Sequence, residues 1–189
     1  MGLLQDASTE FLRAVEELPA GRGADDPCER PTPSEVSVRE LVEHVVAGNR
    51  FAARLLAGVS RDEARAVLSG DQLGADAGSA VRSSCAAQAA AFAAAGPAFA
   101  VPHPNGEIPA SDFLLLRVID LVVHAWDLRR GAGLDERLSP AVVDALWDEV
   151  EPRLAWLLAF GAYGEGPSGS LPPTAPRQMR LLDALGRRP

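Results

Sequence analysis

The chain has 189 residues, of which 47% are hydrophobic and 23% are charged, a globular composition that excludes a disordered or fibrous protein. Its 18 basic residues are all Arg, its net charge is −8 and its pI is about 4.9, so nucleic acid is not expected as a partner. The most apolar stretch, from Phe113 to Leu128, contains charged side chains and therefore does not predict a membrane span.

The N-terminal segment predicts a first helix from Leu3 to Leu18. It carries acidic residues where a signal peptide would have a basic start and an uninterrupted apolar run. We therefore expect a cytoplasmic protein with no membrane partner. Cys28 and Cys85 lie in different segments without a CxxC spacing, so they are expected to be free thiols, and a Cys-based zinc finger is excluded.

Gly and Pro residues divide the rest of the chain into segments with helical periodicity. The second helix has a complete start signal, because Ser37 and Glu40 have the spacing of a capping box. An Ala-rich run forms the third helix, and Ser139-Pro140 opens the fifth. After the first helix, the predicted helices are 37–57, 79–95, 111–130, 140–160 and 176–185.

Long helices with one longer connection, from about Val59 to Gly78, are typical of a helical bundle. The segment FAVPHPNGEIP has room for a short extended piece, but one strand does not change the fold class. We therefore predict an all-α fold in a single domain over residues 1–189.

The predicted helix 111–130 carries a polar stripe. At about 100° per residue, four polar side chains fall within an arc of roughly 80°: Arg117, Asp120, His124 and Asp127. Nearly every other side chain on this helix is apolar, so we expect it to be buried on most sides. The stripe then faces either solvent or a polar cavity in the bundle, and the spacing alone leaves both interpretations open.

His44 in the second helix favours the cavity. It lies within about 60° of the apolar positions Leu41 and Gly48, on the side away from most of the charged residues of that helix. A lone inward-facing His is commonly a hydrogen-bonded core residue, and this alternative stays open. Asp120 and His124, however, lie one turn apart on the other helix, a spacing that lets two side chains converge on one ion.

Together, His44, Asp120 and His124 offer two imidazoles and one carboxylate. This donor set suits zinc with an open coordination position or a non-haem iron site, and nickel or cobalt would also fit. The sequence therefore predicts a divalent metal site formed by two facing helices.

Three segments carry a family resemblance: LVEHVVAGNRFAARLLAG, LLLRVIDLVVHAWDLRRGAG and APRQMRLLDALGRRP. They resemble the small DinB-like helical proteins related to mycothiol-dependent maleylpyruvate isomerase, and in particular the single-domain metal-binding branch that lacks the extra C-terminal domain of that enzyme. The resemblance covers nearly the whole chain. It implies a DinB-like four-helix bundle core with additional C-terminal helices, and a divalent metal held by His44, Asp120 and His124.

The chain departs from the family in two places. Relatives commonly read PTPCxxWxVR before the capping box, whereas this chain reads PTPSEVSVR, which is one residue shorter, has Ser34 at the Cys position and has no Trp. This loop is expected to shape the mouth of the pocket. The isomerase also carries Glu where this chain has Asp120, whose shorter side chain would shift the ion slightly.

The resemblance implies that the open metal position takes the thiol of mycothiol as a co-substrate. A divalent cation lowers the pKa of a bound thiol and gives a strong nucleophile at neutral pH. The expected function is therefore a mycothiol S-transferase or isomerase that acts on a small electrophile through a metal-bound thiolate, in a monomer or homodimer. Because neutral imidazole is the ligating form, activity should fall at acidic pH.

Further side chains receive predicted roles around the metal. Asp127 is predicted to accept the free N–H of His124 and set its tautomer, the alternative being a pair with Arg130 or solvent. Arg117 and Asn49 are predicted to contact an anionic substrate or the thiol cofactor, the alternative being a structural role. His103 is either a general base or additional ligand, or an exposed loop residue.

Two other functions stay open on the sequence: a metal- or small-molecule-binding helical module without catalysis, and a metal enzyme that activates water for hydrolysis. A wide pocket over the metal, lined by Arg, would favour a thiol cofactor. A closed or fully ligated site would favour the binding module.

Overall fold

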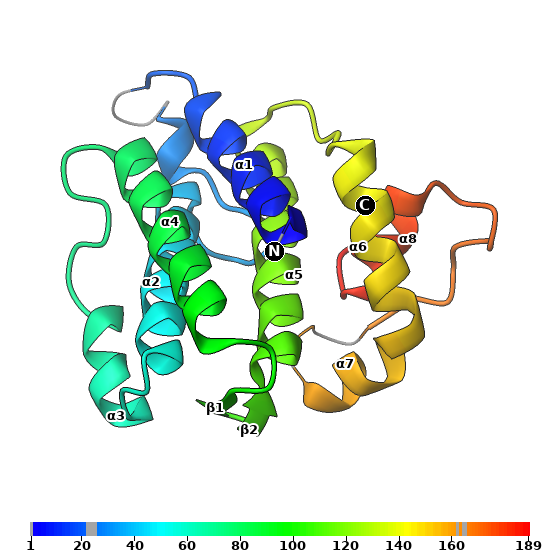
Figure 1. The fold of residues 1–189 in the computed structure, drawn as a ribbon. Helices are drawn as coiled ribbons and strands as arrows, with labels where there is room; N and C mark the ends of the chain where they lie inside the picture. The colour runs from blue at the N-terminus through cyan, green and yellow to red at the C-terminus, as the bar shows by residue number, and fades with distance from the viewer. Residues whose placement is uncertain (1, 22–25, 162, 164–165) are drawn as a thin grey trace. The chain divides into compact units, whose positions relative to one another are not determined.

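The computed structural model describes residues 2–21, 26–161, 163 and 166–189. The described chain is mostly helical and contains a small two-stranded sheet, which confirms the predicted all-α, DinB-like class (Figure 1). Contacts along the chain divide it into two compact units, Met1–Glu136 and Arg137–Pro189. Compactness alone does not establish separate folding, so the single domain over 1–189 stays a prediction.

The first unit has a four-helix core, as predicted. It consists of α1 (Gly2–Glu16), α2 (Val38–Leu56), α4 (Ala77–Ala95) and α5 (Ala110–Ala132). The helices α1 and α2 each pack against both α4 and α5, which closes the bundle (Figure 1). The capping box of Ser37 and Glu40 is present at the start of α2, where each residue bonds the backbone N–H of the other.

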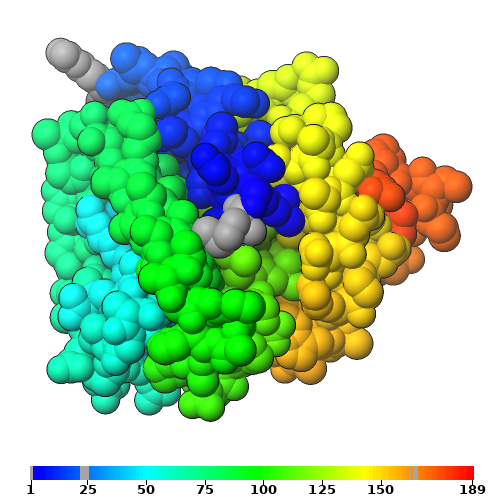
Figure 2. Space-filling view, in the orientation of Figure 1, coloured from blue at the N-terminus to red at the C-terminus, as the bar shows by residue number. Residues whose placement is uncertain are grey.

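The Ala-rich helix α4 fits between α1 and α2 because most of its side chains are small. Asp76 caps its N-terminus by accepting the backbone N–H of Ser79. The side chains of α4 and α1 lie against each other on the face drawn in Figure 2. The inner face of α4 is partly polar, with Ser84 and Gln88 buried there, and these side chains reach toward the candidate site.

The connection between α2 and α4 contains the short helix α3 (Arg61–Ala64) and a 3-10 turn over Arg65–Leu68. The expected extended piece in the later connection is an antiparallel hairpin of β1 (Ala100–His103) and β2 (Gly106–Pro109), in which Val101 pairs with Ile108.

Helix α5 is buried around most of its circumference, as its apolar composition predicts. It nevertheless carries ionisable side chains on one stripe. No helix in the described part of the chain is both long enough and apolar enough to cross a lipid bilayer.

The second unit contains α6 (Pro140–Val150), α7 (Leu154–Phe160) and α8 (Arg177–Ala184), in agreement with the additional C-terminal helices expected from the family resemblance. The prediction of one continuous helix over 140–160 is wrong, because a 3-10 turn over Glu151–Arg153 divides this segment into α6 and α7. Pro152 explains the break, since it has no N–H to donate and its ring conflicts with the carbonyl one turn earlier.

Candidate metal centre

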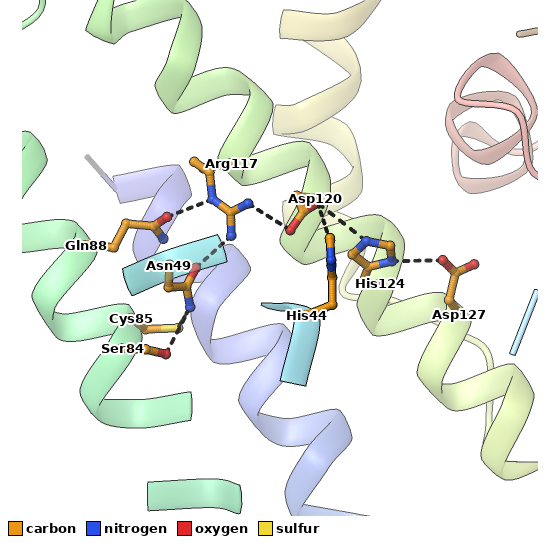
Figure 3. Close-up of polar contacts among 9 residues, drawn as sticks. All are labelled: His44, Asn49, Ser84, Cys85, Gln88, Arg117, Asp120, His124 and Asp127. Atoms are coloured by element: carbon orange, nitrogen blue, oxygen red, sulfur yellow. Dashed lines mark hydrogen bonds and ion pairs between the residues drawn. The ribbon is translucent and has the colours of Figure 1, made fainter. Parts of the chain in front are cut away.

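The structure brings together the three residues that were predicted as metal ligands. His44 comes from α2, whereas Asp120 and His124 lie one turn apart on α5 (Figure 3). Asp120 Oδ1 lies 3.6 Å from Nε2 of His44 and 3.4 Å from Nε2 of His124. One ligand atom from each residue lies within 4.8 Å of the other two. Three donor atoms therefore surround one point, although metal binding itself stays a prediction.

The donor set fits a divalent cation in both chemistry and spacing. Metal–ligand distances of about 2.0–2.2 Å at a tetrahedral centre place neighbouring donor atoms about 3.3–3.6 Å apart, and the two separations from Asp120 Oδ1 are 3.4 and 3.6 Å. The rings of His44 and His124 are close to perpendicular, with an interplanar angle of 86° and centroids 5.2 Å apart, so their nitrogens approach the same point without stacking. Two imidazoles and a carboxylate leave one or more positions for a further ligand.

The centre is open on the side of His44. The side chain of His44 is 59% exposed, whereas that of His124 is only 13% exposed. A cavity of about 510 Å³ reaches His44 and Asp120 and also contains Arg117 in its lining. The remaining lining residues come from α2 and from the connection after it: Glu40, Glu43, Ala47, Gly48, Phe51, Leu68, Gly70 and Gln72. A small molecule therefore has access to the cluster.

Arg117 fixes the orientation of Asp120. Its Nη1 lies 3.1 Å from Oδ2 of Asp120, one turn later on α5. The two carboxylate oxygens therefore have different neighbours, because Oδ2 is next to the guanidinium while Oδ1 lies next to the two imidazoles. Asp120 Oδ2 is buried and accepts no hydrogen bond among the described residues, so the guanidinium of Arg117 is its charge partner. The arrangement favours metal binding through Oδ1 alone.

A buried polar network holds Arg117 in turn. Its Nε donates to Oε1 of Gln88 at 2.9 Å and its Nη2 donates to Oδ1 of Asn49 at 2.8 Å. Asn49 then donates through Nδ2 to Oγ of Ser84 and to Sγ of Cys85 (Figure 3). The network connects α2, α4 and α5 and satisfies most of the polar atoms that the bundle buries there.

The predicted roles of Arg117 and Asn49 can now be compared with their positions. Arg117 lines the cavity, but three protein groups already engage its guanidinium. Asn49 is fully buried, accepts from Nη2 of that guanidinium and is not part of the cavity lining. Contact of either residue with substrate or thiol stays a prediction, and the positions favour a role in holding Asp120.

His124 is held from its other ring nitrogen by Asp127. Nδ1 of His124 lies 3.0 Å from Oδ2 of Asp127, which is fully buried one turn later on α5. This is the contact that was predicted for Asp127. A hydrogen bond at Nδ1 keeps a proton there and leaves Nε2 as the nitrogen that can bind a cation.

Ser34 completes this arrangement from the loop before α2. Its Oγ donates to Oδ2 of Asp127 at 2.9 Å, across 93 residues of sequence. The loop can approach α5 because Gly131 has no side chain, and a Cβ there would lie 3.0 Å from the backbone oxygen of Pro31. A tight turn in which Thr32 bonds the carbonyl of Val36 then holds Ser34 in place.

The charges around the centre stabilise one another. Burial raises the pKa of Asp120, but Arg117 and His124 outweigh this effect and hold the pKa well below its ordinary value. Burial lowers the pKa of His124, but Asp120 and Asp127 outweigh it and raise the pKa to about 9. Without a metal, His124 is therefore a cation at neutral pH, and a metal ion would take the place of its Nε2 proton.

The structure places His103 outside the cluster. It lies in β1, its Nδ1 accepts the backbone N–H of Asn105, and its ring packs against Phe113. Burial and the nearby Arg117 lower its pKa. Cys28 and Cys85 are free thiols, as expected, and burial raises the pKa of each.

Sequence reasoning missed Gln88, Ser84 and the contact of Ser34 with Asp127. Gln88 and Ser84 lie on the face of α4 that is buried, four residues apart. Two polar residues at helical spacing in an otherwise Ala-rich helix were the available signal. Nothing in the local sequence of Ser34 indicates its partner on α5.

Comparisons with known proteins identify a family for most of the chain. Residues 4–129 match the family described as Mycothiol maleylpyruvate isomerase N-terminal domain, and this range contains all three predicted ligands. Two uncharacterized proteins of Mycobacterium tuberculosis, from strains CDC 1551 / Oshkosh and ATCC 25618 / H37Rv, are each 38% identical to the chain over 119 residues. The match covers 58% of this chain and 57% of each relative, so it spans little more than half of their length. No solved structure matches the chain.

Proposed function

The chain belongs to the mycothiol maleylpyruvate isomerase N-terminal domain family, and on this basis we propose that it is a metal-dependent enzyme that uses mycothiol as a co-substrate. The reaction is the transfer of the thiol to a small electrophile, or the isomerisation of that electrophile. The observation that carries the proposal is the cluster of His44, Asp120 and His124 beside an open cavity.

These three residues would hold the divalent cation, with zinc as the first choice and nickel, iron or cobalt as alternatives. When bound, the cation supplies stabilisation of a thiolate relative to the thiol, and so a nucleophile at neutral pH. Neutral imidazoles and a carboxylate are the ligands that these metals share.

The protein supplies orientation around the ion. Asp127 holds a proton on Nδ1 of His124 and so makes Nε2 the nitrogen that would bind the ion. Arg117 holds Oδ2 of Asp120, which leaves Oδ1 on the side of the imidazoles. Because both supporting groups are themselves hydrogen-bonded, by Ser34 and by Asn49 and Gln88, the ligand atoms of Asp120 and His124 would be positioned before any ion arrives.

The cavity supplies access for the two reactants. In the transfer reaction, the thiol sulfur loses its proton and forms a bond to the electrophilic carbon, a double bond of the electrophile becomes single, and the atom that receives its electron pair takes up a proton, so the product is the thiol adduct. In the isomerisation, the same sulfur–carbon bond forms, the carbon framework rotates about a bond that has become single, and the thiol leaves with no net change in atoms. An open cavity of about 510 Å³ supports a reaction of this kind better than a closed binding module.

The decisive test is metal analysis of the purified protein beside His44→Ala and His124→Ala. We expect about one divalent ion per parent chain and a loss of at least tenfold in metal affinity in each variant. His103→Ala is the matched control, because this His lies outside the cluster and should leave the metal content unchanged. Folded variants that keep the metal content of the parent would contradict the assignment of the ligands.

A second experiment separates the proposed reaction from the alternatives. The metal-loaded protein is incubated with mycothiol and a panel of small electrophiles, and the products are analysed by mass. Thiol adducts or isomerised electrophile support the proposal. Turnover of an ester or amide without thiol would indicate a hydrolase, and a bound metal with no turnover of any substrate would indicate a binding module.

A further inference from the structure

We propose that the cavity over the metal centre selects a thiol whose far end carries a positive charge or hydrogen-bond donors, and no carboxylate. This inference rests on the proposed function, because it names the class of thiol that the same site would take. It follows from the charges that line the cavity.

One face of α2 forms a wall of the cavity. Glu40, His44, Ala47, Gly48 and Phe51 line it at intervals of one, three or four residues that place them on one helical stripe. Glu40 therefore lies one turn before His44, with about 5–6 Å between the two Cβ atoms. A molecule that binds next to His44 from the cavity also lies next to this carboxylate.

Glu40 is an anion at neutral pH and has an oxygen available. Hydrogen bonds from the backbone N–H and the Oγ of Ser37 lower the pKa of Glu40. Both hydrogen bonds use Oε2, which leaves Oε1 as an acceptor within the described part of the chain. The capping box thus holds the carboxylate in a fixed position on the cavity wall.

Glu43 adds a second carboxylate to the lining. Its partner is Arg39, at 3.5 Å on the same helix, and the Arg39 side chain is about half exposed. Because such an exposed pair is weak and is screened by solvent, it leaves the Glu43 carboxylate able to interact with a ligand in the cavity. With Glu40, Glu43 gives the α2 side of the cavity lining two carboxylates.

The lining contributed by α5 has the opposite charge once a metal is present. Arg117 lies on this side, and the charge of the divalent ion that the three ligands would hold exceeds the negative charge of Asp120. A thiolate is favoured here, whereas a positive or hydrogen-bond-donating group is favoured beside Glu40 and Glu43. A thiol with a carboxylate at its far end would place two like charges a few ångströms apart, which costs binding energy.

The test uses three thiols that differ only in the group at the end of a two-carbon chain: cysteamine, 2-mercaptoethanol and 3-mercaptopropionate. Each is titrated into the full chain loaded with cobalt(II), because thiolate ligation of cobalt(II) produces a charge-transfer band in the near ultraviolet. We expect the order of affinity to be cysteamine, 2-mercaptoethanol, 3-mercaptopropionate, with about fivefold or more between the first and the last.

The double variant Glu40→Gln, Glu43→Gln removes both charges, and Gln at position 40 still completes the capping box. The ratio of the cysteamine and 3-mercaptopropionate dissociation constants is compared between parent and variant, because this comparison cancels the intrinsic acidity of each thiol. We expect the preference for cysteamine to fall by about threefold or more. Asp6→Asn, Asp148→Asn is the control, since it makes the same change in net charge at exposed residues outside the cavity.

The outcomes separate this inference from the proposed function. Thiols that bind, but with the same ratio in parent and double variant, would overturn the inference alone. An equal loss of preference in the control would also overturn it, because the effect would then come from total charge. A cobalt-loaded protein that shows no thiolate band with any of the three thiols would overturn the proposed function and this inference together.

Discussion

A Cβ atom at Gly48 would lie 2.8 Å from Nη1 of Arg117. Gly in the middle of a helix costs about 1 kcal/mol relative to Ala, and here it makes room for the guanidinium that pairs with Asp120. The close approach of α2 to Arg117 therefore links the backbone of one helix to the orientation of Asp120, a proposed metal ligand, on the other.

We predict that Gly48→Ala weakens metal binding by about tenfold with little loss of stability. The added methyl group pushes the guanidinium away from Asp120 and weakens this ion pair, while the gain in helix propensity of about 1 kcal/mol offsets part of that loss. Metal affinity by competition with a chelator and unfolding in urea measure the two effects. Gly78→Ala in α4 is the control, because its Cβ would meet only ordinary contacts. An equal change in affinity in both variants would argue against this role of Gly48.

Arg117→Met should destabilise the metal-free protein by about 2–4 kcal/mol, because it leaves Asn49, Gln88 and Asp120 without their shared donor in a buried site. Urea unfolding followed by Trp fluorescence measures the loss. Arg82→Met is the matched control, since Arg82 pairs with Glu16 at the surface and should cost less than about 1 kcal/mol. A loss in Arg117→Met no larger than in the control would contradict a structural role for the network.

We expect Asp127→Asn to lower metal affinity by about 10–100-fold, because an amide at this position no longer provides the charged acceptor that fixes His124. Ser34→Ala removes only the hydroxyl that donates to Asp127 and should have a smaller effect. Isothermal titration with zinc measures both. The opposite order of effects would show that the loop, and not the carboxylate, positions His124.

Helical periodicity explains why the clustering of His44, Asp120 and His124 could be predicted. Residues four apart on α5 lie on one face, and His44 occupies the inward face of α2, so local geometry brings the three side chains together once the two helices are assumed to be neighbours. The spacing alone left other roles open for these residues, and the family resemblance favoured the metal site. Asn49 shows the limit of the same argument. It lies five residues after His44, or about 140° around the helix, and therefore faces Ser84 and Cys85 on α4 and not the cavity.

Contacts made across long stretches of chain could not be predicted in this way. Ser34 and Asp127 are 93 residues apart, and Arg117 and Gln88 are 29 apart. These pairs depend on how closely helices and loops approach, which glycines at 48 and 131 control. Periodicity identifies a face of a helix but not the distance to the next element.

The stability of the metal-free protein should decrease as the pH rises through about 9. Asp120 and Asp127 raise the pKa of His124 to about 9, above the value of about 6.5 in an unfolded chain. A raised pKa in the folded state adds stability that is complete below the unfolded pKa and is lost as the pH passes the folded one. Urea unfolding in the presence of a chelator, between pH 6 and pH 10, measures this trend. His124→Gln should reduce it, and an unchanged pH dependence in that variant would assign the effect to another group.

Metal binding should show the opposite dependence on pH. The ion has to replace the Nε2 proton of His124, so apparent affinity should rise about tenfold per pH unit up to about 9, where that proton is already lost. Calorimetric titration with zinc in two buffers of different ionisation enthalpy counts the protons released, and we expect about one per ion near neutral pH. An affinity that does not change between pH 7 and pH 8.5, with no proton released, would mean that the ion binds without displacing the proton of His124. In that case His124 would not be a ligand, and the centre would be reduced to His44 and Asp120.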